Sequence, residues 1–202
     1  MGKYIAGWVC WCLLGFAVGA EAETVVYTFE SPDFTLGEYT PLLSRQPQQG
    51  SSAFRATFTS LPTANGIGVA GIQVSPLFSG QSLMDPYPPP TADTLRVTVN
   101  TPITALQVDF ALFQPDHLRL TSSAGSISAP VLPETQWGTL SFSSTVPFTQ
   151  FDLQGFDPSN QPTQLAIDNL RMTVVPEPSA LTLVAFACGW FGLWGRRPHA
   201  RR

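Results

Sequence analysis

The chain of 202 residues is poor in cysteine, histidine and lysine. Its three cysteines, Cys10, Cys12 and Cys188, all lie in two apolar end segments, and only His117 of its two histidines lies between those segments. A zinc site made of histidine and cysteine is therefore excluded for the central part of the chain, and so is a disulfide framework. We expect the central part to be stabilised by packing, with or without a bound metal ion.

Basic residues and catalytic motifs are also scarce. Residues 23–178 contain five arginines and thirteen acidic residues, a net charge of −8, and this argues against nucleic-acid binding. There is no Gly-x-Ser-x-Gly motif and no glycine-rich phosphate loop, so we expect no enzymatic activity. We expect His117, which follows a Pro-Asp pair, to be a solvated turn residue. Paired carboxylates of the glycosidase type stay an open alternative, because spacing along the chain does not fix their separation in space.

The first 22 residues have the layout of a secretory signal peptide. Lys3 is the only lysine of the chain, residues 4–20 are apolar, and small-residue cleavage patterns end at Ala20 and at Ala22. We therefore expect residues 1–22 to direct export and to be removed by signal peptidase. An uncleaved membrane anchor is the alternative.

The last segment, residues 175–202, has three parts. Pro176-Glu177-Pro178 comes first, an apolar stretch at 180–195 follows, and the basic tail at 196–202 contains four arginines: Arg196, Arg197, Arg201 and Arg202. About 20 apolar residues cross a hydrocarbon core of roughly 30 Å, so 180–195 predicts a short transmembrane helix. The positive-inside rule places the C-terminus in the cytoplasm and the bulk of the chain outside. A permanent anchor and a buried C-terminal helix are the alternatives.

This three-part tail resembles the PEP-CTERM sorting signal of Gram-negative bacteria, with Pro176, Glu177 and Pro178 as its motif. The resemblance implies a protein that is exported and held transiently in the inner membrane. It also implies release to the cell surface or beyond by an exosortase-type transpeptidase. A non-catalytic role in the exopolysaccharide matrix of a biofilm would fit this route.

Apolar and polar residues alternate through most of residues 23–174. A period of two predicts half-buried strands, and we expect about nine: 25–29, 54–59, 66–74, 95–99, 106–112, 118–121, 137–142, 151–153 and 165–175. Prolines and glycines separate these strands, and we expect loops at 37–52 and 76–93. The pattern predicts one all-β domain, an antiparallel β-sandwich of the jelly-roll kind, flanked by the signal helix and the transmembrane helix.

The ends of this domain resemble those of carbohydrate-binding-module-type jelly rolls, which many PEP-CTERM proteins carry. The resemblance covers Tyr27–Glu30 in the first strand and Leu165–Leu170 in the last. It gives a second functional hypothesis, a carbohydrate-binding module for a cell-surface polysaccharide. Tyr39, Tyr87 and Trp137 are the candidates for stacking on sugar rings, unless they are core or loop anchors. Exposed aromatics on one face would favour this hypothesis, whereas an exterior of Thr, Ser and Gln would favour a purely structural role.

The last strand also predicts a metal site. The apolar residues stand at odd positions in Leu165 and Ile167 but at even positions in Leu170 and Met172. The alternation therefore shifts by one residue between them, which predicts a β-bulge at Asp168-Asn169. A bulge and a neighbouring loop can supply the six to eight oxygens that calcium takes. We therefore expect a structural calcium with Glu30 and Asp168 as side-chain ligands. The alternative is that Asp168 and Asn169 only cap the bulge through local hydrogen bonds.

Overall fold

The computed structural model describes residues 22–40, 42–61, 67–71, 81–84, 94–112, 117–133 and 136–175. Residues 23–175 form one compact unit. Residues 1–21 of the predicted signal peptide lie outside the described residues, as do Tyr87 and the predicted sorting motif, transmembrane stretch and basic tail. Within the described ranges, no helix has the length and hydropathy needed to cross a membrane.

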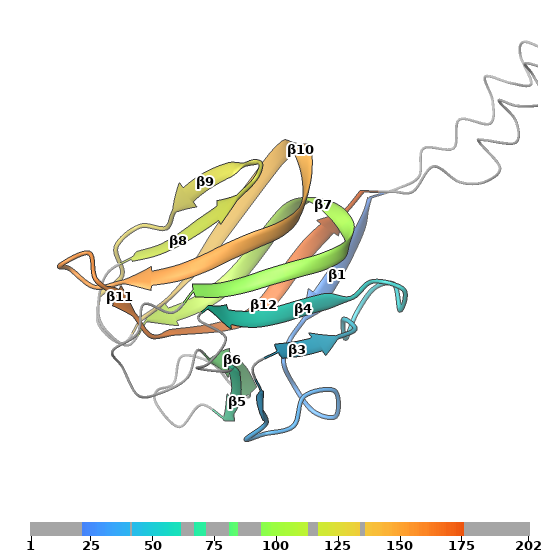
Figure 1. Ribbon diagram of the computed structural model, residues 1–202, viewed down its shortest axis with the longest axis horizontal. Coiled ribbons are helices and arrows are strands. Elements are labelled where there is room, and N and C mark those ends of the chain that lie inside the picture. Colours follow the sequence, from blue (N-terminus) through green and yellow to red (C-terminus); the bar gives the residue numbers. More distant parts are fainter. Residues whose placement is uncertain are drawn as a thin grey trace, which may run out of the picture. The chain divides into compact units, whose positions relative to one another are not determined.

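The described part is all-β with antiparallel pairing, as the alternation predicts (Figure 1). Its strands are β1 (Glu23–Tyr27), β2 (Tyr39–Thr40), β3 (Leu42–Arg45), β4 (Ala56–Leu61), β5 (Ile67–Gly71), β6 (Gln81–Met84), β7 (Thr94–Leu112), β8 (His117–Ser122), β9 (Gly125–Ser128), β10 (Trp137–Phe156), β11 (Pro162–Thr163) and β12 (Leu165–Val174).

Two long strands, β7 and β10, belong to both layers of the fold (Figure 1). In the first layer, residues 103–112 of β7 lie between β12 and residues 137–148 of β10, and β1 and β6 pair with the other edge of β12. In the second layer, residues 94–99 of β7 lie between β4 and residues 150–153 of β10, followed by β8 and β9.

The prediction of separate strands at 95–99 and 106–112, and at 137–142 and 151–153, is therefore wrong. Pro102 lies inside β7 and Pro147 inside β10, where proline was expected to end a strand. Both prolines lie where the β7–β10 register shifts, and such irregularities tolerate a residue without an N–H donor. The buried positions of β7 are odd as far as Ile103 and even from Leu106 onward, so the strand is irregular between these two residues.

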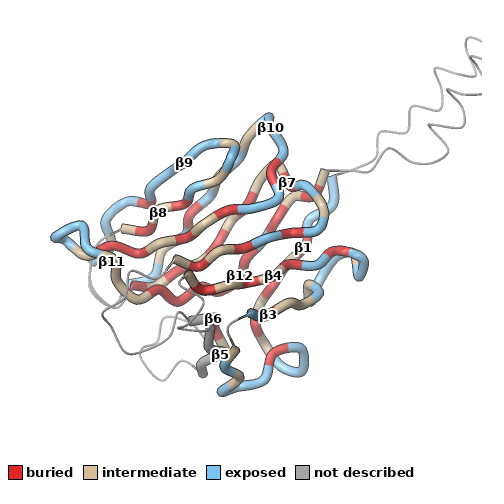
Figure 2. Tube along the Cα trace, viewed as in Figure 1, coloured by how far each residue is buried: buried red, intermediate tan, exposed pale blue. Residues whose placement is uncertain are grey.

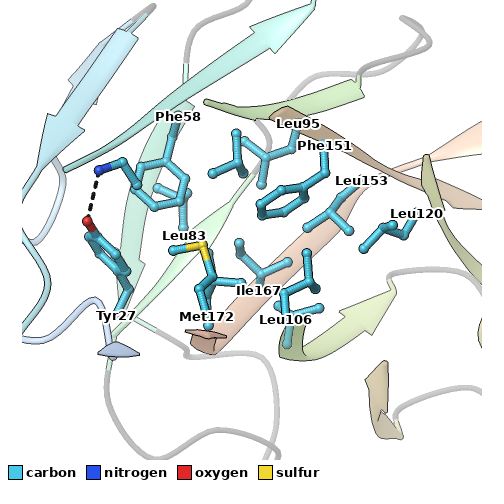
Figure 3. Packing of buried hydrophobic residues seen from close by; sticks show 14 of the residues in the cluster. Tyr27, Phe58, Leu83, Leu95, Leu106, Leu120, Phe151, Leu153, Ile167 and Met172 are labelled. Carbon is cyan, nitrogen blue, oxygen red and sulfur yellow. Dashed lines mark hydrogen bonds between the residues drawn. The ribbon is translucent and has the colours of Figure 1, made fainter. Parts of the chain in front are cut away.

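Both layers contribute large side chains to one core. Figure 3 shows two facing groups, Phe58, Leu95, Phe151, Leu153 and Leu120 from the second layer and Tyr27, Leu83, Met172, Ile167 and Leu106 from the first. Buried and exposed positions alternate along the strands that enclose this core (Figure 2). The sandwich is thus held by apolar burial, as a domain without cysteine requires.

Tyr27 carries the one phenol in this core. Its ring packs edge-on against Phe58 with 5.5 Å between centroids. The hydroxyl accepts a hydrogen bond from the Ala56 N–H at 2.9 Å (Figure 3). It donates one to the Arg45 carbonyl at 3.0 Å. Burial raises the pKa of Tyr27 above its ordinary value. The buried hydroxyl thereby joins β1 to β3 and β4 without an unsatisfied polar group.

Two predicted loops contain strands. β2 and β3 lie within 37–52, and β6 lies within 76–93. Each of these strands is only two to four residues long, and β3 and β6 each bury a leucine, Leu43 and Leu83, in the core. Such short strands are stabilised by pairing with distant neighbours, β4 for β3 and β12 for β6, so no local period reveals them.

Candidate functional site

One outer face of the sandwich combines a hollow, an exposed indole and several polar side chains. We call it the groove face. Directly paired residues of an antiparallel ladder share a face. The pairings of β1, β12, β7 and β10 give this face four rows: Thr24-Thr173-Ala105-Ser143, Val26-Arg171-Gln107-Ser141, Asp168-Asp109-Thr139 and Ala166-Ala111-Trp137.

The first two rows enclose an open groove of about 350 Å³. Thr24, Gln107, Ser141 and Arg171 are among its lining residues. The Arg171 side chain is exposed, and the ion pairs formed among the described residues involve Arg45 and Arg96 instead. Gln107 and Arg171 therefore offer hydrogen-bond donors to whatever enters this groove.

Trp137 lies at the end of the fourth row and is 51% exposed. It is the first residue of β10, and Leu140 behind it is buried, as the sequence predicts. Its neighbours in the row are Ala111, which is half-buried, and Ala166, which is buried. The indole therefore offers a flat apolar surface to solvent at this end of the row.

The third row is acidic. The Thr139 hydroxyl donates to Asp109 Oδ1 at 2.7 Å. Asp168 is only 5% exposed and accepts hydrogen bonds from its neighbour Asn169, at 2.7 Å from the backbone N–H and at 3.2 Å from the side-chain amide. Burial raises the pKa of Asp168 to about 6, Asn169 opposes this shift, and the charges of Glu30 and Asp109 add to it. The row therefore holds carboxyl groups without a cationic partner among the described residues.

The predicted β-bulge is confirmed. The β12–β7 register shifts between Asp168 and Arg171, and Asn169 adopts a left-handed φ of 46°. The hydrogen bonds from Asn169 to Asp168 fit the alternative in which the pair caps the bulge.

The calcium site stays a prediction. The charge of Glu30 acts on Asp168, and Glu30 Oε1 also accepts a hydrogen bond from the Gln81 N–H at 2.9 Å. No group of three or more His, Cys, Asp or Glu side chains suited to a metal occurs in the part of the chain that the structure describes.

The other residues singled out in the sequence lie elsewhere. His117 opens β8 and is half-buried, stacked on Phe156 with 5.2 Å between ring centroids, so the expectation of a solvated side chain is wrong. Tyr39 is 60% exposed in β2. Sequence reasoning missed Arg171 and Gln107, although both occupy outward positions of their strands.

The opposite outer face, on the second layer, is rich in threonine, and we call it the threonine face. One of its rows is Leu42-Thr59-Arg96-Asp152-Thr121. Arg96 binds Asp152 through two hydrogen bonds of 2.8 Å, and the Thr57 hydroxyl donates to Ser44 at 3.1 Å. Its polar groups thus bind one another.

No family model matches the sequence, and no curated protein matches it. Among solved structures, a family 29 carbohydrate-binding module is 11% identical over 76% of this chain and 89% of that chain, with a TM-score of 0.40. A mutant module of that family complexed with mannohexaose is 12% identical over 76% and 92%, with a TM-score of 0.40. Another, complexed with cellulohexaose, is 10% identical over 75% and 92%, with a TM-score of 0.38. At such low TM-scores these similarities carry no argument about this chain.

Proposed function

We propose that the protein is a non-catalytic surface or matrix protein whose groove face binds a cell-surface polysaccharide. The observation that carries this proposal is the exposed Trp137 ring on the same face as a groove lined by Gln107, Ser141 and Arg171. Binding sites for small ligands combine aromatic surface with a few polar groups that fix orientation. The groove face has both, with Trp137 as the aromatic and Gln107, Asp109 and Arg171 as the polar groups.

The chemistry of sugars suits this arrangement. A sugar ring has an apolar face of C–H groups that can lie on an indole, and its hydroxyls both donate and accept hydrogen bonds. Trp137 supplies the flat apolar surface. Asp109 accepts from hydroxyls, whereas Arg171 and Gln107 donate to ring and hydroxyl oxygens. None of these groups needs to transfer a proton, so binding without catalysis is the simplest function for this face.

Binding to a glycan array, and to the exopolysaccharide of the host cell, tests the proposal. The full chain is kept in mild detergent, so that both apolar ends are present. Trp137→Ala should weaken binding at least about tenfold, the loss expected for a truncated aromatic anchor. The matched control is Leu42→Ala, because Leu42 is 53% exposed on the threonine face. Glycan binding that survives Trp137→Ala would contradict the proposal.

The route to the surface is the second part of the proposal. It rests on residues 1–22 as a signal peptide, Pro176-Glu177-Pro178 as sorting motif, 180–195 as transient membrane span and the basic tail. Its partners would be signal peptidase, the inner membrane and an exosortase-type transpeptidase. Replacing Pro176, Glu177 and Pro178 by alanine should leave the protein in the inner membrane, as should loss of the transpeptidase. Intact mass after cell fractionation measures this, and surface protein that retains its tail would contradict it.

A further inference from the structure

The groove on the groove face is lined by one cation and by uncharged residues. Six of its lining residues have polar side chains: Thr24, Gln107, Ser141, Ser143, Arg171 and Thr173. The others are alanine, leucine and phenylalanine. Among the described residues that line the groove, none is Asp or Glu, so Arg171 alone sets its charge. A groove of this composition attracts a negatively charged group.

The polar side chains of the groove are accessible to solvent. Four of the six are exposed, and Gln107 and Thr173 are half-buried. None of the six side chains forms a hydrogen bond or an ion pair with another residue of the described ranges. They are therefore hydrated, and a ligand that enters the groove can take the place of this water.

The chemistry of these side chains favours a carboxylate. The Arg171 guanidinium has five N–H donors and no acceptor, and its planar fork fits a carboxylate through two parallel hydrogen bonds. The Gln107 amide and the Ser141 hydroxyl lie in the same row as Arg171 and can also donate. A carboxylate in the groove would thus find donors from β12, β7 and β10, and Arg171 would balance its charge.

The surroundings of the groove limit it to one carboxylate at a time. The four rows of the groove face contain no cation besides Arg171. Asp109, which belongs to the third, acidic row, lies two residues from Gln107 along β7, a rise of about 7 Å. A second carboxylate beside the first would be repelled by Asp109, and a polyanion needs a series of cations. The site therefore suits an isolated acidic sugar in an otherwise neutral chain.

The groove and the Trp137 indole are separate binding positions on one face. Trp137 does not line the groove, and it comes four residues before Ser141 on β10, a rise of about 14 Å. Thr139, between them on the same face, is exposed, as are Trp137 and Ser141. One sugar is too short to occupy both positions, whereas an oligosaccharide that follows the exposed side chains of β10 can reach both.

We propose that the groove binds the carboxylate of an acidic sugar, with Arg171 as its charged partner, in a polysaccharide whose neutral sugars lie on Trp137. This inference rests on the proposed function and adds to it the charge class of the ligand. Trp137 binds acidic and neutral chains alike, and Arg171 distinguishes between them.

Titration calorimetry on the full chain in mild detergent tests this assignment with two pairs of probes. The first pair is the exopolysaccharide of the host cell before and after reduction of its carboxyls to alcohols. The second is a xylose oligomer with and without one glucuronate branch. The acidic member of each pair should bind about tenfold more tightly, the effect of one charge-assisted bidentate contact.

Variants at two arginines assign this preference to the groove. Arg171→Gln should reduce the affinity of the acidic member to that of the neutral member. Arg171→Lys, which keeps the charge but not the planar fork, should retain a smaller preference. The matched control is Arg119→Gln, which removes the same charge from β8, where Arg119 lies over the Phe156 ring, and should leave the preference intact.

Each outcome separates the inference from the proposed function. Equal binding of acidic and neutral members, or a preference that survives Arg171→Gln, overturns the inference. The proposed function then stands if Trp137→Ala still weakens the binding of both members. Arg171-dependent binding that survives carboxyl reduction overturns the carboxylate and assigns a sulfate or phosphate group instead. An absence of any Trp137-dependent glycan binding overturns both the inference and the proposed function.

Discussion

The groove face and the threonine face are built on the same two strands, β7 and β10, and both are polar. On the threonine face, Arg96 and Asp152 bind each other, and so do Thr57 and Ser44. On the groove face, Arg171 has no ion-pair partner among the described residues, and Asp168 is buried near two other carboxyls. Arg171 is exposed to water and can exchange that water for a ligand, whereas the paired groups of the threonine face bind each other. The difference between the faces lies in how their side chains are paired, rather than in which residue types they contain.

The largest effect that we expect from this difference is on the pH dependence of stability. Burial raises the pKa of Asp168 to about 6 in the folded protein, from its ordinary value of 3.8. Its contribution to stability is therefore full below pH 4 and is lost as pH rises through 6. The free energy of unfolding should fall by up to about 3 kcal/mol over this window. Urea denaturation at pH 4 and at pH 7 measures it.

Asp168→Asn is the control for this prediction. An amide does not titrate, so the free energy of unfolding of this variant should fall much less between pH 4 and pH 7. On the threonine face, Asp152→Asn should leave the decrease as it is in the parent protein. A parent protein that is equally stable at both pH values would contradict a buried Asp168 that lies near other carboxyls.

The calcium prediction also concerns Asp168, and it tests a second difference between the groove face and the threonine face. If Glu30 and Asp168 bind calcium, ionised Asp168 stabilises the protein once the metal is present. Free calcium at 100 times its Kd should then raise the free energy of unfolding by about 2.7 kcal/mol. Thermal denaturation with chelator and with calcium at pH 7 measures this, and Asp168→Asn should abolish the difference. If chelator leaves the Tm unchanged, no calcium is bound, and Asp168 and Asn169 only cap the bulge.

The smallest expected effect on stability distinguishes the paired Arg96 of the threonine face from Arg171 of the groove face. Asp152→Ala should cost about 1 kcal/mol at most, because the ion pair with Arg96 is half-exposed. Arg171→Ala should change stability by less than about 0.5 kcal/mol, because no described partner is lost. Glycan binding should show the opposite order, with a loss for Arg171→Ala and none for Asp152→Ala. Equal effects of both variants in both measurements would remove the distinction between the faces.

The sequence predicted those parts of the fold that depend on one strand at a time. The alternation around Leu106 and Val108 predicted their burial, and the change of parity near Asp168 predicted the bulge. The boundaries of β7 and β10 were wrong, because Pro102 and Pro147 interrupt a local pattern without interrupting the strands. β3 and β6 were missed because their stability comes from pairing with β4 and β12.

By itself, the sequence determined the all-β class and the outward or inward direction of most side chains, since a period of two fixes both within each strand. It also determined that the domain is held by apolar burial rather than by disulfides. Only the tertiary structure decided which strands are neighbours and in what register. Tyr39 and Trp137 share a row because five separate strand pairings align them. A shift of one residue in any of those pairings would place the rings on opposite faces, and no local pattern in the sequence encodes that choice.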